Sequence, residues 1–506
     1  MLSIGGIFTI IALSWAAVFL YGLAICVYNV YFHPLSKFPG PTLWATSFIF
    51  RHVAAMRGDL DWSIKKFHSQ YGEVVRFSPE ELSFTNERAW KDIYGHKTVP
   101  LAKDPMLYNS VKLGSDGATS IFNASPEMHP IIRKQLAYAF SDKALREQEP
   151  LIRGYIDLLM KKLRDTAQSR TPTDLVRWYN FTTFDLIGDL AIGRSFGCLH
   201  DNEYHTWVRG LTEGTKIGPY IRTMATYTDI KWLWRVLAPE RIKQARLRHE
   251  AYVRETAAER MARGVLEERK DFLSYILKNR DGKDGLTDAE VTANAGFLIV
   301  AGSEAASTAL SGITFNLLKT PWALERAIRE VREAFQSEEE IDFASTSTKL
   351  PYLMACISEG MRAFPPGPTI PPRRTPPGNT ITDIAGYQVP SWTSVGVHPL
   401  STTHSPTNFY MPDNFIPERW LPSATEDPSS PYYHDKREAV QPFSVGPRSC
   451  LGKSLAYNEM RVILARLLWN FDIVLCAESD AWDKQATYTL WDKKPLMCQL
   501  RDVRAK

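Results

Sequence analysis

The residue types with the clearest chemical potential lie in one segment, residues 442–452, which reads Pro-Phe-Ser-Val-Gly-Pro-Arg-Ser-Cys-Leu-Gly. Gly446 and Gly452 favour a tight turn with close backbone approach. Arg448 places a cation two residues before Cys450, and a segment of helical periodicity follows at once. A helix N-terminus and a nearby cation favour thiolate over thiol, and a thiolate can bind iron. Taken alone, the pattern fits a buried structural cysteine equally well.

The other five cysteines predict no second site of this kind. They are scattered along the chain without a C-x-x-C pair, at Cys26, Cys198, Cys356, Cys476 and Cys498. This spacing argues against a disulfide scaffold and against a zinc site. Isolated cysteines usually pack as small apolar residues, and we expect that of these five.

A lone carboxylate in an otherwise uncharged helix is the second chemical feature. Thr287 and Glu290 form a capping box that predicts a helix start, and Pro321 predicts its end. Between residues 291 and 318 the only charged side chain is Glu304, so we expect this helix to be buried in a large domain. Because burying an unpaired charge is costly, Glu304 is either a functional acid or a salt-bridged structural residue.

The elements that must position these groups are mostly helical. Helical patterns dominate from about residue 59 to residue 362, whereas strand-like pieces are short, at residues 73–77 and 82–85. Residues 364–447 are crowded with Pro, Gly, Ser and Thr, which predicts loops, turns and short strands. The predicted fold class is mainly α with a small β region.

The N-terminal segment predicts a membrane anchor. Residues 1–36 contain no charged side chain, and residues 4–27 are mostly apolar. As a helix they would extend roughly 36 Å, enough to cross a hydrocarbon core of about 30 Å. A cleaved signal peptide is the alternative, but the basic n-region is missing and the apolar stretch is too long. Lys37, Arg51 and Arg57 follow the helix and none precedes it, which places the large body in the cytoplasm.

The chain therefore divides into an anchor helix at residues 1–30, a proline-rich hinge at 31–45 and one body at 46–506. Its 44% apolar and 23% charged residues are ordinary for a globular protein. A net charge of only +4 argues against a nucleic-acid binder. The hydrophobic segment 232–236 is a candidate second contact with the membrane.

Phe443, Gly446, Arg448, Cys450 and Gly452 match, at every fixed position, the haem-binding signature of the cytochromes P-450. The sequence resembles that family over nearly its whole length. The resemblance implies the cytochrome P-450 fold, preceded by a single transmembrane helix, and a haem b whose iron is held by Cys450.

Further motifs agree in order. Glu359-Gly-Met-Arg362 resembles the family's Glu-x-x-Arg helix motif, and Phe415-Ile-Pro-Glu-Arg419-Trp resembles its later Pro-Glu-Arg segment. In the family, Arg419 would join Glu359 and Arg362 in a buried charge network. Residues 301–305 resemble the oxygen groove of the family's long central helix, and residues 31–41 resemble its membrane-proximal hinge.

The sequences of residues 32–41, 139–141 and 182–189 resemble those of microsomal cytochromes P-450 from fungal secondary metabolism. That resemblance implies a single-pass enzyme of the endoplasmic-reticulum membrane with its catalytic domain, residues 46–506, in the cytoplasm. Electrons would come from NADPH through a separate flavoprotein reductase. The substrate would be a lipophilic terpenoid, polyketide or alkaloid.

Haem propionates need cations, and by resemblance the candidates are Arg448, Arg373, His129 and Arg133. His129 and Arg133 are spaced i, i+4 and would share a helix face, for which a solvated face is the alternative. A separate basic group, Lys436, Arg437 and Lys453, brackets the haem loop in sequence and could meet an acidic reductase surface. There too the alternative is an ordinary solvated charge cluster.

The sequence departs from the family pattern at Ala305, where a threonine hydroxyl usually helps to relay protons. Ser307 is turned away by about 200°, and Thr308 lies about 4.5 Å further along the axis. Water, Glu304 or a substrate hydroxyl must take over this role. We predict Glu304 as the catalytic proton donor, because it is the only ionisable side chain on that stretch.

Three functions remain open from the sequence. The first is a monooxygenase that oxidises a lipophilic small molecule. The second is a haem-thiolate isomerase or dehydratase, which the missing groove threonine at Ala305 makes more plausible. The third is a non-catalytic haem-binding protein. Dependence on a reductant separates the first from the second.

Overall fold

The computed structural model describes residues 4–112, 118–226, 240–264, 271–278, 280, 282 and 285–505. The segment 232–236, the predicted second membrane contact, lies outside the described residues.

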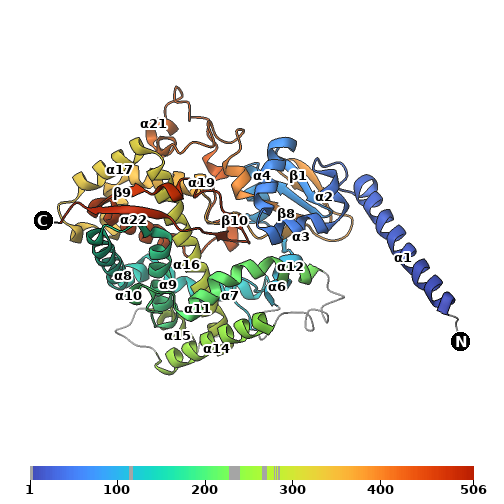
Figure 1. The fold of residues 1–506 in the computed structure, drawn as a ribbon, viewed down its shortest axis with the longest axis horizontal. Coiled ribbons are helices and arrows are strands. Elements are labelled where there is room, and N and C mark those ends of the chain that lie inside the picture. The colour runs from blue at the N-terminus through green and yellow to red at the C-terminus, as the bar shows by residue number, and fades with distance from the viewer. Residues whose placement is uncertain are drawn as a thin grey trace.

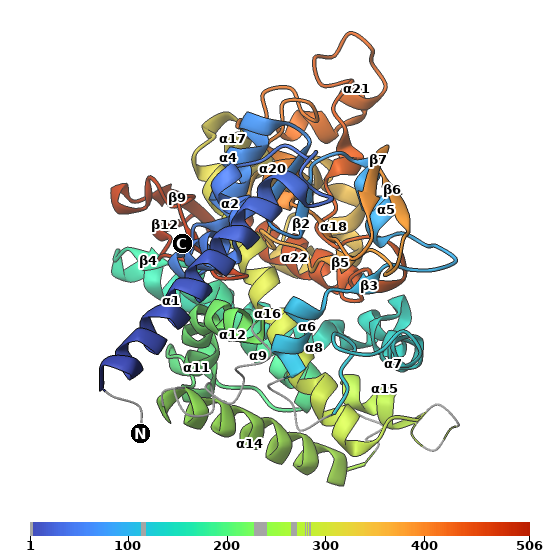
Figure 2. The ribbon, with the colours of Figure 1, turned by 90° about the vertical axis from the view of Figure 1, so that its right-hand side faces the viewer.

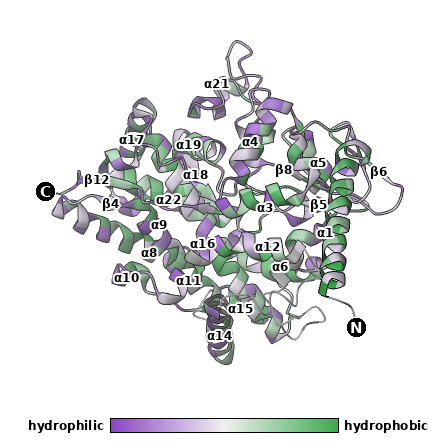
Figure 3. Ribbon diagram, turned by 45° about the vertical axis from the view of Figure 1, so that its right-hand side comes forward, coloured by the Kyte–Doolittle hydropathy of each residue, from purple (hydrophilic) through white to green (hydrophobic). Residues whose placement is uncertain are grey.

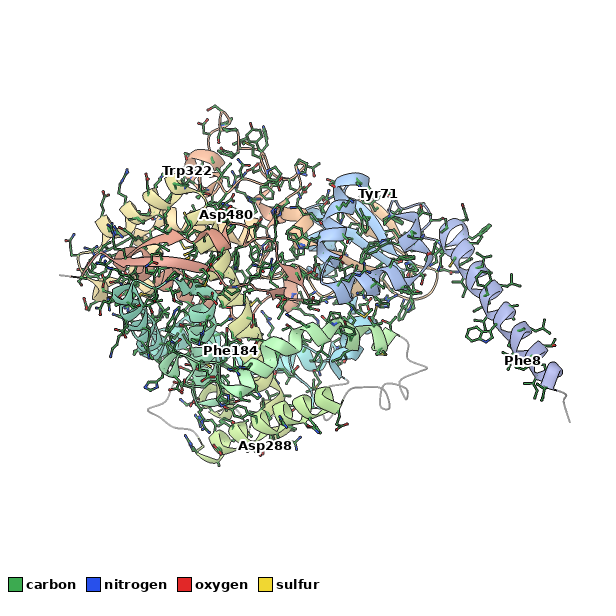
Figure 4. All side chains as sticks on the ribbon, in the orientation of Figure 1. Phe8, Tyr71, Phe184, Asp288, Trp322 and Asp480 are labelled. Carbon is green, nitrogen blue, oxygen red and sulfur yellow. The ribbon has the colours of Figure 1, made fainter. Side chains whose placement is uncertain are left out.

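Helix α1 (Ile4–Val27) projects from the body of the molecule and has no buried residue (Figure 1). A short π-helical stretch, Tyr28–Phe32, continues it. Figure 3 shows α1 as hydrophobic along its length, and in Figure 4 Phe8 stands clear of the body. The apolar span Ile4–Phe32 is long enough to cross a membrane, and none of its most apolar window is buried. Because free apolar surface of this length favours a bilayer, the structure agrees with the predicted anchor.

The other long apolar helix, α16 (Asp288–Leu318), runs through the middle of the body (Figures 1 and 2). It starts at the predicted capping box: Thr287 Oγ1 accepts a hydrogen bond from the N–H of Glu290 at 3.3 Å, and the Glu290 carboxylate accepts one from the N–H of Thr287 at 2.9 Å. Of its most apolar window, 72% is buried inside the protein. It is therefore a core helix, as its charge-poor sequence indicated.

Three helices pack around α16 and position the site: α9 (Leu175–Ile192), α19 (Pro351–Ala363) and α22 (Lys453–Asn470). Close approach between α16 and α19 depends on a glycine. A Cβ atom at Gly360 would lie only 2.4 Å from Cγ1 of Ile313. The crossing therefore excludes any larger residue at this position.

Further helices complete the mainly helical body. They are α2 (Thr42–Thr46), α3 (Phe48–Arg57), α4 (Leu60–Tyr71), α5 (Arg88–Tyr94), α6 (Pro105–Lys112), α7 (Met128–Ala137), α8 (Asp142–Ser169), α10 (Cys198–Asp201), α11 (Thr206–Gly214), α12 (Gly218–Thr226), α14 (Glu240–Ala262), α15 (Phe272–Lys278), α17 (Pro321–Ala334), α18 (Phe343–Lys349), α20 (Pro399–Thr403) and α21 (Pro422–Thr425).

The β structure is small, as predicted, and most of it lies toward the α1 side of the body (Figure 1). One five-stranded sheet has the order β1-β2-β8-β5-β3, in which β2 and β8 pair in parallel and the other neighbours are antiparallel. The two strands expected at residues 73–77 and 82–85 are β1 (Val74–Ser78) and β2 (Glu81–Phe84).

The other strands of that sheet are β3 (Ala102–Lys103), β5 (Arg373–Arg374) and β8 (Ser394–Val397). A three-stranded sheet has the order β4 (Thr173–Asp174), β12 (Met497–Asp502) and β9 (Phe471–Leu475). Two two-stranded sheets pair β6 (Ile381–Ile384) with β7 (Tyr387–Pro390) and β10 (Ala486–Thr487) with β11 (Trp491–Asp492).

A fully buried charge network ties the irregular segment 364–447 to helix α19. Arg362 donates to both carboxylate oxygens of Glu359, at 2.9 and 2.8 Å, and Arg419 Nε lies 3.1 Å from the same carboxylate. Arg419 also pairs with Asp435, and none of the first three side chains is exposed. Because a buried carboxylate needs compensating partners, the three motif residues meet as the resemblance implied.

Candidate functional site

One cavity lies between α16 and the segment that carries Cys450, with an empty volume of about 1490 Å³ that includes space open to solvent. The Cys450 side contributes Phe443, Arg448 and Gly452 as well as the thiol. Helix α7 contributes His129 and Arg133, and β5 contributes Arg373. Seven of the predicted site residues therefore surround one space: His129, Arg133, Arg373, Phe443, Arg448, Cys450 and Gly452.

The loop before α22 holds Cys450 in place and turns its side chain to this cavity. The backbone N–H of Cys450 donates to the carbonyl of Phe443 at 2.8 Å. Gly446 has φ +77°, and a Cβ there would lie 2.1 Å from the carbonyl oxygen of Tyr94. A residue with a side chain is thus excluded twice, by backbone conformation and by space. Gly446 does not line the cavity and shapes the loop instead.

The charge environment of Cys450 differs from the prediction. Burial raises the pKa of the Cys450 thiol, while the N–H of Gly452 and the Arg133 cation act to lower it. Arg133, whose Nη1 donates to the Ser449 carbonyl at 2.7 Å, is the cation beside the thiol. The expectation that Arg448 plays this part is wrong, because two residues of sequence separation do not determine where the long arginine side chain ends.

Arg448 instead belongs to a basic cluster in the cavity wall, formed by His129, Arg133, Arg373 and Arg448. Burial and the neighbouring Arg448 cation lower the pKa of His129 to about 4. Burial, with Arg373 nearby, also lowers the pKa of Arg448. Arg373 donates to the Tyr108 hydroxyl at 3.0 Å.

This cluster leaves hydrogen-bond donors facing the cavity. Within the described part of the chain, the Arg448 guanidinium and the His129 ring make no hydrogen bond. Grouped, partly buried guanidinium groups with free donors are costly unless an anion joins them. A haem, with two propionates and an iron atom for the Cys450 thiolate, matches this donor set.

The opposite wall is apolar. It is formed by one face of α16, here called the α16 wall, whose members are Ala301, Gly302, Ala305, Ala306 and Ala309. The glycine among them has a packing role too, because a Cβ on Gly302 would lie 2.7 Å from the end of Ile187 on α9. None of the five side chains carries a hydroxyl or a charge.

Glu304 is not brought to the cavity with the other predicted residues. Its carboxylate forms an ion pair with Lys493 at 2.6 Å, and the ammonium also donates to Ser307 Oγ at 2.8 Å and Thr308 Oγ1 at 3.0 Å. Both charged side chains are at least nine-tenths buried. This geometry matches the salt-bridged alternative for Glu304.

Lys493 is the partner that the sequence analysis missed. It lies 189 residues beyond Glu304, just after β11, in a segment with no recognisable motif. No local signal predicts such a pairing. The sequence indicated only that the lone buried charge of Glu304 needs a cation as its partner.

Comparison with known proteins decides the family. The family model "Cytochrome P450" matches residues 39–500. The chain is a cytochrome P450. Its cofactor is accordingly a haem-thiolate, and the cavity between Cys450 and α16 is where the residues fit one. The family also implies a redox partner and a small-molecule substrate.

Named relatives are fungal monooxygenases. A "Trichothecene C-4 hydroxylase" of Trichoderma arundinaceum is 46% identical over 476 residues, which cover 94% of each chain. A "Cytochrome P450 monooxygenase olcB" of Penicillium canescens is 45% identical and covers 97% of this chain and 98% of its own. An "Averantin hydroxylase" of Dothistroma septosporum is 38% identical, with coverage of 96% and 90%. This P450 is therefore a monooxygenase oxidoreductase, and the isomerase and non-catalytic readings lose their support.

The predicted reductase-facing group of this P450 is only partly available. Lys436 forms an ion pair with Glu87 at 3.1 Å. Arg437 points inward and donates to the backbone carbonyls of Arg419, Asp435, Ala424 and Tyr432. The prediction that Arg437 belongs to an exposed charge cluster is therefore wrong, because a guanidinium with five donors can bind several carbonyls at once. Lys453, at the start of α22, is exposed.

Proposed function

We propose that this cytochrome P450 is a single-pass enzyme of the endoplasmic-reticulum membrane that takes electrons from NADPH through a separate flavoprotein reductase. Residues 1–30 form the anchor, residues 31–45 the hinge, and residues 46–506 the catalytic domain, which faces the cytoplasm. The free apolar surface of α1 and the cations that follow it support this arrangement.

In this proposal Cys450 is the ligand to the iron of haem b, and the bound haem supplies the activation of dioxygen. Arg448, Arg373, His129 and Arg133 hold its propionates, and Phe443, Gly446 and Gly452 shape the loop around the thiolate. One observation carries the proposal. The Cys450 thiol and the α16 wall face each other across one cavity that is also lined by three arginines, Arg133, Arg373 and Arg448.

The reaction is a tailoring step of fungal secondary metabolism. The names of a trichothecene C-4 hydroxylase and an averantin hydroxylase among the relatives support the oxidation of a lipophilic secondary metabolite, a terpenoid, polyketide or alkaloid. So does the lining near the α16 wall, where Phe122, Phe297 and Leu298 add apolar surface. Such surface stabilises a lipophilic substrate by removing it from water.

Proton supply at this site has to work without a hydroxyl on the α16 wall. Because the α16 wall has no hydroxyl, protons reach the cavity through water, through the substrate or from the neighbouring helix face. Glu304 lies about 100° around the helix from Ala305, and Thr308, which contacts Lys493, lies between them at about 60°. We propose Glu304 as the donor, acting through water at that edge.

The test is reconstitution of the full chain with a fungal NADPH–P450 reductase in lipid vesicles. Each candidate terpenoid or polyketide is supplied in four mixtures: complete, without NADPH, without reductase and without dioxygen. We expect an oxygenated product in the complete mixture alone. Product at full rate without NADPH and dioxygen would contradict the proposal, and protease accessibility of the body in intact microsomes tests the orientation.

A further inference from the structure

One titratable group in the cavity wall has no part in the site described so far. Glu459 lies on α22, nine residues after Cys450, and is 3% exposed. It lines the cavity together with Leu455, Ala456 and Met460 of the same helix. These positions follow the helical spacing of one face, so Glu459 is directed to the cavity with its apolar neighbours.

Nothing in the described part of the chain compensates this carboxyl group. It forms no ion pair and no hydrogen bond through its side chain there. The protein treats its other buried acids differently. Glu359 is bound by two arginines and an indole N–H, and Glu304 by Lys493. An uncompensated buried carboxylate is strongly unfavourable, so the neutral acid is the stable form.

The electrostatics agree with the geometry. Burial raises the pKa of Glu459 to about 8, and no charged neighbour contributes. The charged or titratable groups that share its cavity are Lys103, Tyr108, His129, Arg133, Arg373, Arg448 and Cys450, and none of them is among the causes.

Charged groups that pack on α22 from other helices lie elsewhere. Arg466 pairs with Asp157 of α8, and Arg332 of α17 donates to the carbonyl of Leu468. Both contacts lie seven or more residues further along α22, which is about 10 Å of helix. Neither contact contributes to the pKa of Glu459.

The ionisation of a buried acid without a partner depends on the net charge of the cavity that it lines. Adding one electron to the iron adds one negative charge to the cavity that Glu459 lines. That charge disfavours the ionised carboxylate further, so it draws a proton from water onto the acid. One electron and one proton enter together, and no other reactant is needed.

We propose that Glu459 is a proton-linked group that sets the reduction potential of the haem site. Neutral Glu459 favours the reduced, more negative state, and ionised Glu459 opposes it. This inference rests on the proposed haem-thiolate site. It goes beyond that site because it gives Glu459 an electrostatic effect on the haem and not the role of a ligand.

The direction of this coupling predicts how the midpoint potential of the haem depends on pH. Below about pH 8 the acid is protonated in both redox states, so the midpoint potential stays constant. Above that value reduction takes up a proton. The potential then falls with pH toward the limit of about 59 mV per unit for one proton and one electron.

The experiment is spectroelectrochemical titration of the purified full-length holoenzyme from pH 6.5 to 9.5. We expect the falling limb in the wild type and its loss in Glu459→Gln, which keeps the shape and cannot ionise. Glu459→Asp restores an acid and keeps a falling limb. The control is Glu330→Gln: Glu330 is half-buried on α17, burial also raises its pKa, and its carboxylate accepts from the N–H groups of Tyr352 and Leu353 outside the cavity. It should leave the profile unchanged.

A flat wild-type profile, or an identical falling limb in Glu459→Gln, overturns the inference. The reduced carbonyl-bound spectrum separates this from failure of the haem-thiolate site, because loss of the thiolate band there overturns the proposed function instead. If Glu459→Gln takes up no haem, redox-difference infrared spectra of the wild type at pH 8.5 decide. A protonated carboxyl band that grows on reduction supports the inference, and its absence overturns it.

Discussion

The two walls of the cavity are built from opposite kinds of residue. The Cys450 side gathers cations from three parts of the chain, with donors at Arg448 and His129 that face the cavity. The α16 wall presents only alanine and glycine, and Glu304, Ser307 and Thr308 on the neighbouring face of that helix contact Lys493. The difference fits the proposed binding of the cofactor by the basic side chains of the Cys450 side. The α16 wall itself offers no proton donor, so in the proposed function Glu304 must act through water at its edge.

The largest expected effect comes from the polar wall. Cys450→Ser keeps the size of the side chain but removes the soft anionic ligand, so we expect loss of activity and of the red-shifted thiolate band in the reduced, carbonyl-bound spectrum. Cys356→Ser on α19 is the control for a buried thiol outside the cavity. A thiolate band that survives in Cys450→Ser would mean that another residue holds the iron.

A smaller effect is expected from the helix that carries the apolar wall. Glu304→Gln should lower product formed per NADPH by about tenfold and divert electrons to peroxide, less than the roughly 10²–10⁴-fold typical of a direct general acid. Ala305→Thr should raise the yield if it fits, because it restores a hydroxyl to the α16 wall. Product and peroxide per NADPH are the measurements.

Lys493→Met separates catalysis from structure at Glu304. It removes one partner of a buried pair, which costs about 3–5 kcal/mol of folding stability. If Glu304 serves only the ion pair, the thermal stability of Glu304→Gln and of Lys493→Met falls, while product per NADPH stays at the wild-type value in each. That outcome would refute the proton-donor role.

The smallest expected effect lies outside both walls. Lys453→Glu should slow electron transfer from the reductase several-fold at low salt, and the difference should vanish near 1 M salt, where the screening length is about 3 Å. Lys66→Glu, an exposed lysine on α4 in the β-rich part of the body, is the matched control. Stopped-flow reduction rates across a salt series test it, and equal rates for the wild type and Lys453→Glu at low salt would remove Lys453 from the contact.

Much of this protein was determined by its sequence alone. The anchor, the capped core helix α16 and the loop around Cys450 each depend on a local pattern: an apolar run, a capping box, or glycines at fixed spacing. Such patterns act over a few residues through backbone geometry and side-chain periodicity, so they can be read without the fold. The same holds for the two short strands β1 and β2.

The tertiary structure alone decided which charges meet. The cation beside Cys450 is Arg133 and not Arg448, Arg437 serves backbone carbonyls, and Glu304 is bound to Lys493, 189 residues away. Glu459, by contrast, is left without a partner in the described chain. The physical reason is that burial and pairing of a charge depend on every element packed around it, and long side chains reach partners that sequence spacing does not specify.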